Sequence, residues 1–299
     1  MQYRHAPAAN HAALDAVLAS APGRPTLPVR LTVELAGRAR THLPADAPLT
    51  VWDPCCGAGV TLTVLGLLVP CLARLVGTDA DPEPLDLARR NLALLDPGGL
   101  AARAADLDAL AARHDKPSYA DAATAARTLV PASTPAWSVA PADARDTAAV
   151  RRALAGAGLR DAGGTGIGGT GIGGTGSVGA ASDAAPRAAT GPDLVLADLP
   201  HGHRTAWAAS PTRPGGADAP APDAGPVRGT GPIRDTADNR DPGVEFLRAV
   251  ATVLRPDAVV VAVGRGRTVP LPGGVRPLER VRVGHRAAVL VRAGALQEG

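Results

Sequence analysis

Aromatic side chains are almost missing from this chain, since Trp, Tyr and Phe make up 2% of its 299 residues against 45% hydrophobic residues in all. A hydrophobic core of this composition has to be built from Ala, Val and Leu. Lysine is scarcer still: Lys116 is the only one, and the other strongly basic residues are arginines. We attribute this pattern, with the high Ala, Gly and Pro content, to a bias of coding composition. The counts of Ala, Pro and Arg therefore carry no functional signal.

Cysteine is also scarce, and its placement excludes two classes of site. The chain has three cysteines, of which Cys55 and Cys56 are adjacent. An odd number with two neighbours does not form a disulfide framework. No Cys-x-x-Cys or His-x-x-x-His pair stands near them, so the spacing typical of a zinc site is missing and we expect no metal. His201 and His203 lack a third ligand.

Long apolar runs are absent too. No run approaches the roughly 18 residues that a membrane-spanning helix needs, and the segment MQYRHAPAAN lacks the apolar core of a signal peptide. We therefore expect a cytoplasmic protein with no membrane partner. The net charge of +3 and pI near 9.1 are mildly basic. They are compatible with a nucleic-acid partner without requiring one.

Strand and helix patterns alternate along the chain. Short apolar runs predict strands at 49–52, 74–81, 137–146, 192–202 and 258–264. Apolar or amphipathic spacing predicts helices at 11–20, 28–43, 61–73, 82–95 and 243–254. This alternation is typical of an α/β fold with a doubly wound, mostly parallel sheet and helices on both faces. Residues 276–294 are predicted to add a final pair of strands, including an antiparallel C-terminal strand.

The domain organisation follows from the same patterns. We expect a single domain over 1–299, with an N-terminal helical extension at 1–45 and a helical hairpin inserted at 101–130. Two Gly- and Pro-rich segments, 161–190 and 209–242, are predicted to be flexible insertions. The repeat GGTGIGGTGIGGTG inside the first is too short for a solenoid, and no strand leads into it as a phosphate loop would require.

The motif DPCCGAG follows the first predicted strand. It places Asp53 at the end of the strand, and Gly57 and Gly59 at the start of a helix, where free backbone N–H groups can face a ligand. Nicotinamide sites use G-x-G-x-x-G here, but the third glycine is missing and no cation that would match a phosphate lies nearby. A cofactor with a sulfonium and an amino-acid end fits better than a pyrophosphate. We interpret Cys55 and Cys56 mainly as small packing residues.

Further acids lie at the ends of the predicted strands or in the loops that follow them. Asp79 ends the second strand, where a carboxylate can accept ribose hydroxyls, and Asp143 follows the third. Asp81 is a weaker candidate, since an acid before Pro82 more often caps a helix. The fourth strand ends in DLPH, residues 198–201. Here Asp198 and the Leu199 carbonyl can hydrogen-bond a nucleobase N–H, while Pro200 makes the turn rigid and His201 projects from it.

Taken together, these motifs resemble those of the avilamycin-resistance 23S ribosomal RNA guanine methyltransferase family. The segments that carry the resemblance span most of the chain outside the two insertions: YRHA, APGRPTLPVRL, LTVWDPCCGAGVTLTVLGLL, DADPEPLDLARRNLALLDPGGL, KPSY, DLPHGHRTAW and RVGHRAAVLVRA. The resemblance implies a Rossmann-like class I fold and S-adenosylmethionine as cofactor. It also implies methylation of a guanine nitrogen in 23S rRNA, with the large ribosomal subunit as partner and orthosomycin resistance as one role.

The resemblance also assigns roles to residues. It implies that Asp53, Gly57 and Gly59 bind the methionine end of the cofactor, with Cys55 beside them. Asp79 would bind the ribose, with Asp81 as a further candidate, and Asp143 would bind the adenine. The turn Asp198, Leu199, Pro200 and His201 would hold the target base. Candidates for RNA contact are Arg30, Arg204 and Trp207.

One departure from the family keeps alternatives open. The family's usual fourth residue in the D-L-P-x turn is tyrosine, which stacks on the base, whereas this chain has His201. A catalytically silent RNA-binding relative therefore remains an alternative. So does an N-methyltransferase for another nucleobase or a protein amide. An NAD-dependent oxidoreductase is disfavoured by the missing third glycine. We expect a monomer.

Overall fold

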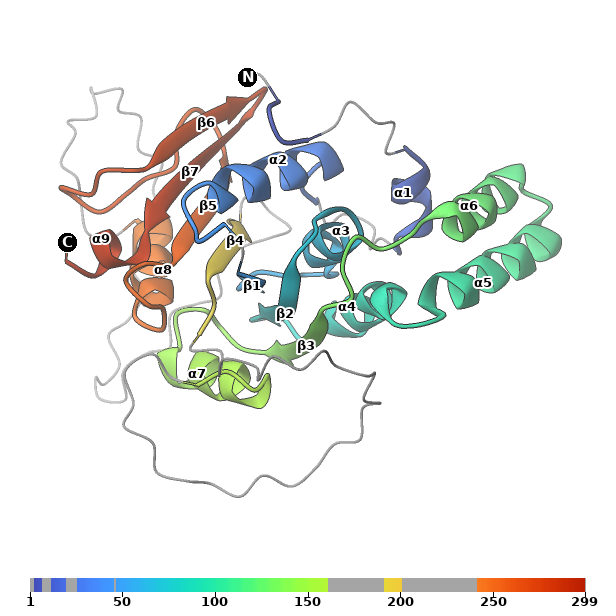
Figure 1. Cartoon of the computed structure of the whole chain (residues 1–299), viewed down its shortest axis with the longest axis horizontal. Coiled ribbons are helices and arrows are strands. Elements are labelled where there is room, and N and C mark those ends of the chain that lie inside the picture. The colour runs from blue at the N-terminus through green and yellow to red at the C-terminus, as the bar shows by residue number, and fades with distance from the viewer. Residues whose placement is uncertain are drawn as a thin grey trace, which may run out of the picture.

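A single seven-stranded sheet organises the part of the chain that the computed structural model describes, which is residues 3–6, 12–19, 26–45, 47–160, 191–200 and 241–298. The strands are β1 (Leu49–Asp53), β2 (Leu72–Asp79), β3 (Ala136–Pro141), β4 (Leu194–Asp198), β5 (Val259–Arg265), β6 (Glu279–Val283) and β7 (Arg286–Arg292). Their order is β3-β2-β1-β4-β5-β7-β6 (Figure 1). Neighbouring strands are parallel except where β7 pairs with β5 and β6. This confirms the predicted doubly wound sheet with an antiparallel C-terminal strand.

Helices cover both faces of the sheet. The described helices are α1 (Ala12–Val17), α2 (Val29–Arg40), α3 (Val60–Leu68), α4 (Leu85–Leu92), the 3-10 helix η1 (Ala93–Leu95), α5 (Gly99–His114), α6 (Pro117–Thr128), α7 (Thr147–Gly156), α8 (Pro242–Ala251) and α9 (Ala293–Gln297). The alternation along β4 separates the two cores: Leu194 and Leu196 pack on the side of α2 and α3, and Val195 and Ala197 on the side of α7 and α8. None of the described helices combines the length and apolar character that a bilayer crossing demands.

Two element boundaries differ from the prediction. Helix α7 was not predicted, because 137–146 was interpreted as the third strand with its exit loop and no element was assigned to the residues after it. Yet Asp146 caps the helix, accepting hydrogen bonds from the backbone N–H groups of Ala148 and Ala149. At the second boundary, Asp241 caps α8 and Pro242 begins it, although both were assigned to the insertion 209–242. The rest of that insertion and residues 161–190 lie outside the described residues.

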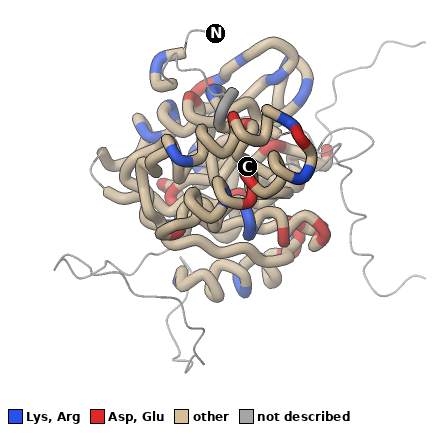
Figure 2. The backbone as a smooth tube through the Cα atoms, turned by 90° about the vertical axis from the view of Figure 1, so that its right-hand side faces the viewer, with Lys and Arg blue, Asp and Glu red and all other residues tan. Residues whose placement is uncertain are grey.

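Charged residues of both signs are interspersed over the surface (Figure 2). Several arginines form ion pairs with acids: Arg38–Glu279, Arg89–Asp86, Arg127–Asp108, Arg145–Asp143, Arg255–Asp193 and Arg286–Asp198. An exposed pair contributes little to stability, so the half-buried pairs matter most.

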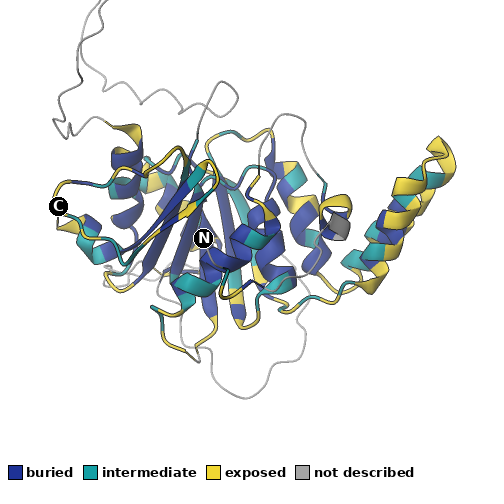
Figure 3. Ribbon diagram, turned by 90° about the horizontal axis from the view of Figure 1, so that it is seen from above, coloured by how far each residue is buried: buried dark blue, intermediate teal, exposed yellow. Residues whose placement is uncertain are grey.

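The helical hairpin of α5 and α6 projects from one end of the body (Figure 3). Asp115 joins the two helices in the left-handed conformation, with φ of 48°, and Pro117 begins α6. The small side chains of Ala122, Ala123 and Ala126 are buried, while much of the arm is exposed. The arm agrees with the hairpin expected at 101–130.

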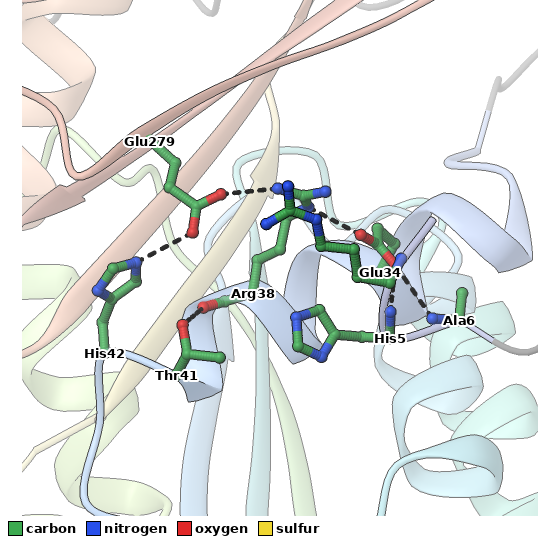
Figure 4. A network of polar contacts seen from close by, with 8 residues as sticks. His5, Ala6, Glu34, Arg38, Thr41, His42 and Glu279 are labelled. Atoms are coloured by element: carbon green, nitrogen blue, oxygen red, sulfur yellow. Dashed lines mark hydrogen bonds and ion pairs between the residues drawn. The ribbon is translucent and has the colours of Figure 1, made fainter. Parts of the chain in front are cut away.

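The segment before β1 is part of the helical layer on the sheet. Leu31 and Leu35 of α2 are buried in the core that the sheet shares with α3. The carboxylate of Glu34 is fully buried, and its Oε2 accepts hydrogen bonds from the backbone N–H groups of residues 4, 5 and 6 at 2.7–3.0 Å. Arg38 donates to Glu34 and Glu279, at 2.8 Å each (Figure 4). This network fastens the N-terminal turn to α2, and α2 to β6.

Candidate active site

Three carboxylates lie at the carboxyl edge of the sheet. Asp53, Asp79 and Asp198 are the last residues of β1, β2 and β4, which are neighbours in the sheet. Val51 and Leu196 pack in the core on the side of α2 and α3. Asp53 and Asp198 stand two residues after them on the same strands, so both carboxylates project on that side. Ligands bind in such sheets at the carboxyl ends of the strands. The structure thus brings together the acids that the strand pattern placed there.

Asp53 is the most buried of them, with an exposed fraction of 2%. Its burial raises the pKa of the carboxyl well above the usual value, and the negative charges of Asp79 and Asp198 raise it further. The backbone N–H of Cys55 donates to Asp53 Oδ1 at 3.0 Å and opposes this shift. A buried acid with a raised pKa next to two others favours a cationic ligand, because a cation stabilises the ionised form.

The glycine turn after β1 is fixed by backbone hydrogen bonds. The Gly57 N–H donates to Asp79 Oδ2 at 2.8 Å, and the Gly59 N–H donates to the Cys56 carbonyl at 2.7 Å. Both glycines have positive φ, 49° and 71°. A Cβ on Gly59 would lie 3.0 Å from Ala88 Cα, whereas one on Gly57 would meet nothing within 4 Å. Gly59 therefore lets α3 pack on α4, and Gly57 leaves room beside the turn.

The adjacent cysteines have the environment of packing residues. Burial raises the pKa of the Cys55 and Cys56 thiols, and the nearby carboxylates raise it further. Cys56 packs so closely on Gly77 that a Cβ there would lie 2.9 Å from its Sγ. Such thiols are neutral and poorly suited to nucleophilic attack. Among the described residues, no group of three or more His, Cys, Asp or Glu side chains could hold a metal ion.

Asp143 lies beside Asp79, because β3 pairs with β2 and the Ala142 N–H donates to the Asp79 carbonyl at 2.9 Å. Burial alone would raise the pKa of Asp143, but hydrogen bonds from Arg145 outweigh it and lower the pKa. Arg145 donates through its backbone N–H, Nε and Nη2. This arginine was not predicted as a site residue, although it stands two residues after the acid.

Asp81 has a different role from the one expected. It was interpreted mainly as a helix-capping acid, but α4 has Pro84 at its N-cap and no side-chain cap. Asp81 instead accepts from the Glu83 N–H at 2.9 Å, and its own N–H donates to Asp79 Oδ1 at 3.0 Å. It therefore stabilises the turn between β2 and α4.

Arg286 is a second site residue that was not predicted from the sequence. Its Nη1 donates to both carboxylate oxygens of Asp198, at 2.8 and 3.0 Å, and its Nη2 donates to the Thr26 carbonyl at 3.3 Å. Both side chains of the ion pair are only 15% exposed. Leu199 is buried, and its N–H donates to the Val263 carbonyl at 2.8 Å. The start of the D-L-P-H turn is thus held by β5 and β7.

The remaining candidates divide into two groups. Pro200 ends the described part of the turn, and His201, Arg204 and Trp207 lie outside the described residues. Arg30, on α2, stacks its guanidinium over the Tyr3 ring at 4.0 Å, which is a cation–π contact.

Asn91 was not foreseen as a site residue. It is 1% exposed, exchanges two hydrogen bonds with the Ala19 backbone, and donates to the Ala58 carbonyl, all at 2.8 Å. It therefore joins the glycine turn to the N-terminal segment. Its signal in the sequence is a polar residue on the apolar face of the helix predicted at 82–95.

A separate cavity of about 520 Å³ opens at the opposite edge of the sheet. Its lining includes Leu49, Leu72 and Leu194, at the amino ends of β1, β2 and β4. It is mostly apolar and contains none of the carboxylates described above.

Comparison with known proteins shows the family. The protein-family model described as rRNA methyltransferase AviRa matches residues 1–217 of this chain. The chain belongs to the AviRa family of rRNA methyltransferases. It is 37% identical over 305 residues to the 23S rRNA (guanine(2535)-N(1))-methyltransferase of Streptomyces viridochromogenes, covering 99% of this chain and 98% of the relative. The resemblance found in the sequence is thereby confirmed, and so is the assignment as a methyltransferase.

Solved structures of AviRa agree with the observed fold. Two structures of the Streptomyces viridochromogenes protein, at 2.4 and 1.5 Å, each match with a TM-score of 0.70 and 36% identity. Each match covers 100% of this chain and 99% of the AviRa chain. The described residues therefore have the class I methyltransferase fold.

Proposed function

We propose that this protein methylates N1 of a guanine in 23S rRNA, using S-adenosylmethionine, at the position equivalent to that of its Streptomyces relative. The near full-length 37% identity to that relative carries the proposal. The carboxylate edge supports it, because the acids stand where the cofactor and a base would meet. Orthosomycin resistance is the physiological role we infer from the AviRa family.

The residues present fit the cofactor. S-adenosylmethionine, when bound, supplies an electrophilic methyl group on a sulfonium, and its methionine end carries an ammonium group. Asp53 offers that cation a buried carboxylate whose pKa is raised by burial and by its acidic neighbours. The open space at Gly57 leaves room for the methionine end. Asp79 would accept from the ribose and Asp143 would accept from the adenine amine, with Cys55, Gly59 and Asp81 completing the walls.

At the end of β4, Asp198 and the Leu199 carbonyl would hold the guanine. N1 of guanine carries a hydrogen that has to leave as the new N–C bond forms. The Asp198 carboxylate is oriented by two hydrogen bonds from Arg286 and can accept that N–H. Its task is to align the nitrogen and to stabilise or take up the proton, since alignment at close contact provides much of the rate in such a transfer. His201 would stack on the base.

Methyl transfer from tritiated S-adenosylmethionine to 23S rRNA, followed by mass spectrometry of the modified nucleotide, tests the proposal. Asp198→Asn should abolish most transfer while calorimetry shows cofactor affinity within a few fold of the parent. Asp146→Asn, which alters only the cap of α7, is the matched control and should stay active. A methyl group on another base or another nitrogen would contradict the substrate assignment. A parent protein inactive on every rRNA would favour the silent relative.

The same experiment separates the roles of the turn. His201→Tyr restores the residue that the family normally uses and should keep or raise activity. Loss of activity in that variant would show that the imidazole has a function other than stacking. Growth with an orthosomycin, with and without the gene, tests the resistance role.

A further inference from the structure

The carboxyl edge of the sheet is divided by charge. β1, β2 and β4 end in Asp53, Asp79 and Asp198, whereas β5 ends in Arg265 and β7 begins with Arg286. Arg265 lies two residues after Val263, so it projects on the same side of the sheet as Asp198. One half of the edge therefore attracts cations, and the adjoining half attracts anions.

The basic half is unusually free of acids. Residues 264–286 contain six arginines and a single acid, Glu279. The α5–α6 arm offers a comparison, since residues 99–130 contain four Lys or Arg and four Asp. The arm projects from the body of the molecule (Figure 3), whereas the basic half adjoins Asp198, since β5 pairs with β4. The excess positive charge is thus local to the end of β5 and the β6–β7 hairpin.

Three exposed arginines form what we call the arginine rim: Arg265, Arg267 and Arg282. Arg265 lies directly opposite Arg286 in the β5–β7 ladder, and Arg282 lies opposite Ala287. The Gly266 N–H donates to the His285 carbonyl at 2.8 Å, which holds the end of β5 against the turn between β6 and β7. Arg265 ends β5 and Arg267 follows it, while Arg282 lies on β6 and projects on the opposite face, because its ladder partner Ala287 packs in the core on the side of α8. The three arginines therefore surround the ends of two strands rather than share one face.

The positive charge of the arginine rim is not balanced by acids within the described part of the chain. Like charges directly opposite each other in a sheet are destabilising. Arg286 is neutralised by Asp198, but none of the rim arginines forms an ion pair within the described part of the chain. Other arginines, such as Arg38 and Arg145, are paired with acids. Exposed, unpaired guanidinium groups next to an active site are suited to phosphate oxygens, which they can bind with two parallel hydrogen bonds.

We propose that the arginine rim binds backbone phosphates of the RNA strand next to the target guanine. The inference rests on the proposed function and adds the docking residues to it. Phosphate contacts fix register and orientation without reading sequence. A guanine turned out of its strand toward Asp198 brings its flanking phosphates close to the ends of β5 and β7. Asp79, at the end of β2, disfavours phosphates on its side of the edge, so the strand is directed onto the rim and away from the cofactor site.

Salt-dependent RNA binding tests this directly. The probe is a 23S rRNA transcript that contains the guanine mapped in the methylation assay, or the whole 23S rRNA if no methylation is found. Affinity is measured by filter binding over a salt series. The triple variant Arg265→Gln/Arg267→Gln/Arg282→Gln should bind at least tenfold more weakly at low salt. Its slope of log K against log salt should be shallower by about 0.7 for each phosphate that the variant no longer binds.

Two controls give the result its meaning. Arg152→Gln removes an exposed arginine from α7, which packs against β2 and β3 at the other end of the strand order, and should leave the slope unchanged. The charge-keeping triple Arg→Lys variant should retain most of the affinity. If the Gln triple binds like Arg152→Gln, or if the Lys triple is weakened as much as the Gln triple, the proposal is overturned.

Kinetics distinguish docking from chemistry. The Gln triple should raise KM for RNA and leave kcat at saturating RNA, and the cofactor Kd, within about threefold. A fall of kcat with unchanged KM would assign the rim to the chemical step and contradict docking. A parent that binds RNA through the rim without methylating it would refute the proposed function alone, because binding is measured independently of methyl transfer.

Discussion

Replacing Glu34 by glutamine should lower the free energy of unfolding by about 2–4 kcal/mol. The carboxylate is fully buried and accepts four hydrogen bonds, three from the backbone of residues 4–6 and one from Arg38. A hydrogen bond to a charged group contributes about 1.5–3 kcal/mol. Glutamine can keep the three backbone contacts as weaker neutral ones, but its amide nitrogen would face the Arg38 Nε–H, donor against donor. The decrease in the free energy of unfolding should therefore equal roughly the contribution of one charged hydrogen bond plus the weakening of three others.

Urea unfolding and amide hydrogen exchange measure the two parts of this effect. The midpoint should fall, and the amides of His5 and Ala6 should lose their protection. Glu279→Gln is the matched control: this acid also binds Arg38, but it is 27% exposed and should cost less. A Glu34→Gln protein within about 0.5 kcal/mol of the parent, with protected amides, would refute the reasoning, because surface changes lie in that range.

The same carboxylate predicts the acid side of the stability curve. Burial raises the pKa of Glu34, but the hydrogen bonds from His5, Arg4, Ala6 and Arg38 outweigh it and leave the pKa below its usual value. A lowered folded-state pKa stabilises the protein fully above the pKa of the unfolded chain, about 4.3. That stability is lost as pH falls through the folded pKa. Glu34→Gln should therefore unfold with a shallower dependence on pH below about 4.3.

Four further predictions concern the site. Because the pKa of Asp53 is raised, cofactor binding should release a proton and should become tighter as pH rises through that pKa. Calorimetry in buffers of different ionisation enthalpy should show this proton release, and Asp53→Asn should remove it. Asp79→Ala should weaken cofactor binding by about 1–3 kcal/mol, and unchanged calorimetric affinity would place the ribose elsewhere. Arg286→Ala should lower kcat far more than it changes the cofactor Kd, and Arg286→Lys should recover part of the activity in the methyl-transfer assay. Gly59→Ala should lower the melting temperature, because φ is 71° and the new Cβ would meet α4 at 3.0 Å; an unchanged temperature would contradict this account.

Features with a local signal could be predicted from the sequence. Short apolar runs locate the strands. The acids that end them, Asp53, Asp79 and Asp198, come together because parallel strands share one carboxyl edge. Arg286 could not be found this way. It stands 88 residues from Asp198, and nothing near either residue indicates the other. Glu34 is similar, since the partners of its carboxylate lie about 30 residues away in a turn without regular structure.

Helix α7 was missed for a different reason. Asp146 with the Ala-rich run after it is a local capping signal, but Asp146 was placed in the exit loop of the third strand and no helix was predicted after it. The division of the carboxyl edge of the sheet into an acidic and a basic half has no local signal in the sequence either, because it depends on the antiparallel pairing of β7 with β5. Only that topology places Arg286 between Asp198 and the β6–β7 turn.

The contacts between the two ends of the chain have a consequence for biosynthesis. Arg38 reaches Glu279 across 241 residues, and Arg286 reaches Thr26 across 260. Ribosomes add about 5–20 residues per second, so Arg38 and Thr26 wait many seconds for these partners. Until β7 has emerged, Asp198 has no Arg286 to orient it, and the nascent chain holds the acidic half of the edge without the basic half. The site is therefore completed only after β7 has been synthesised.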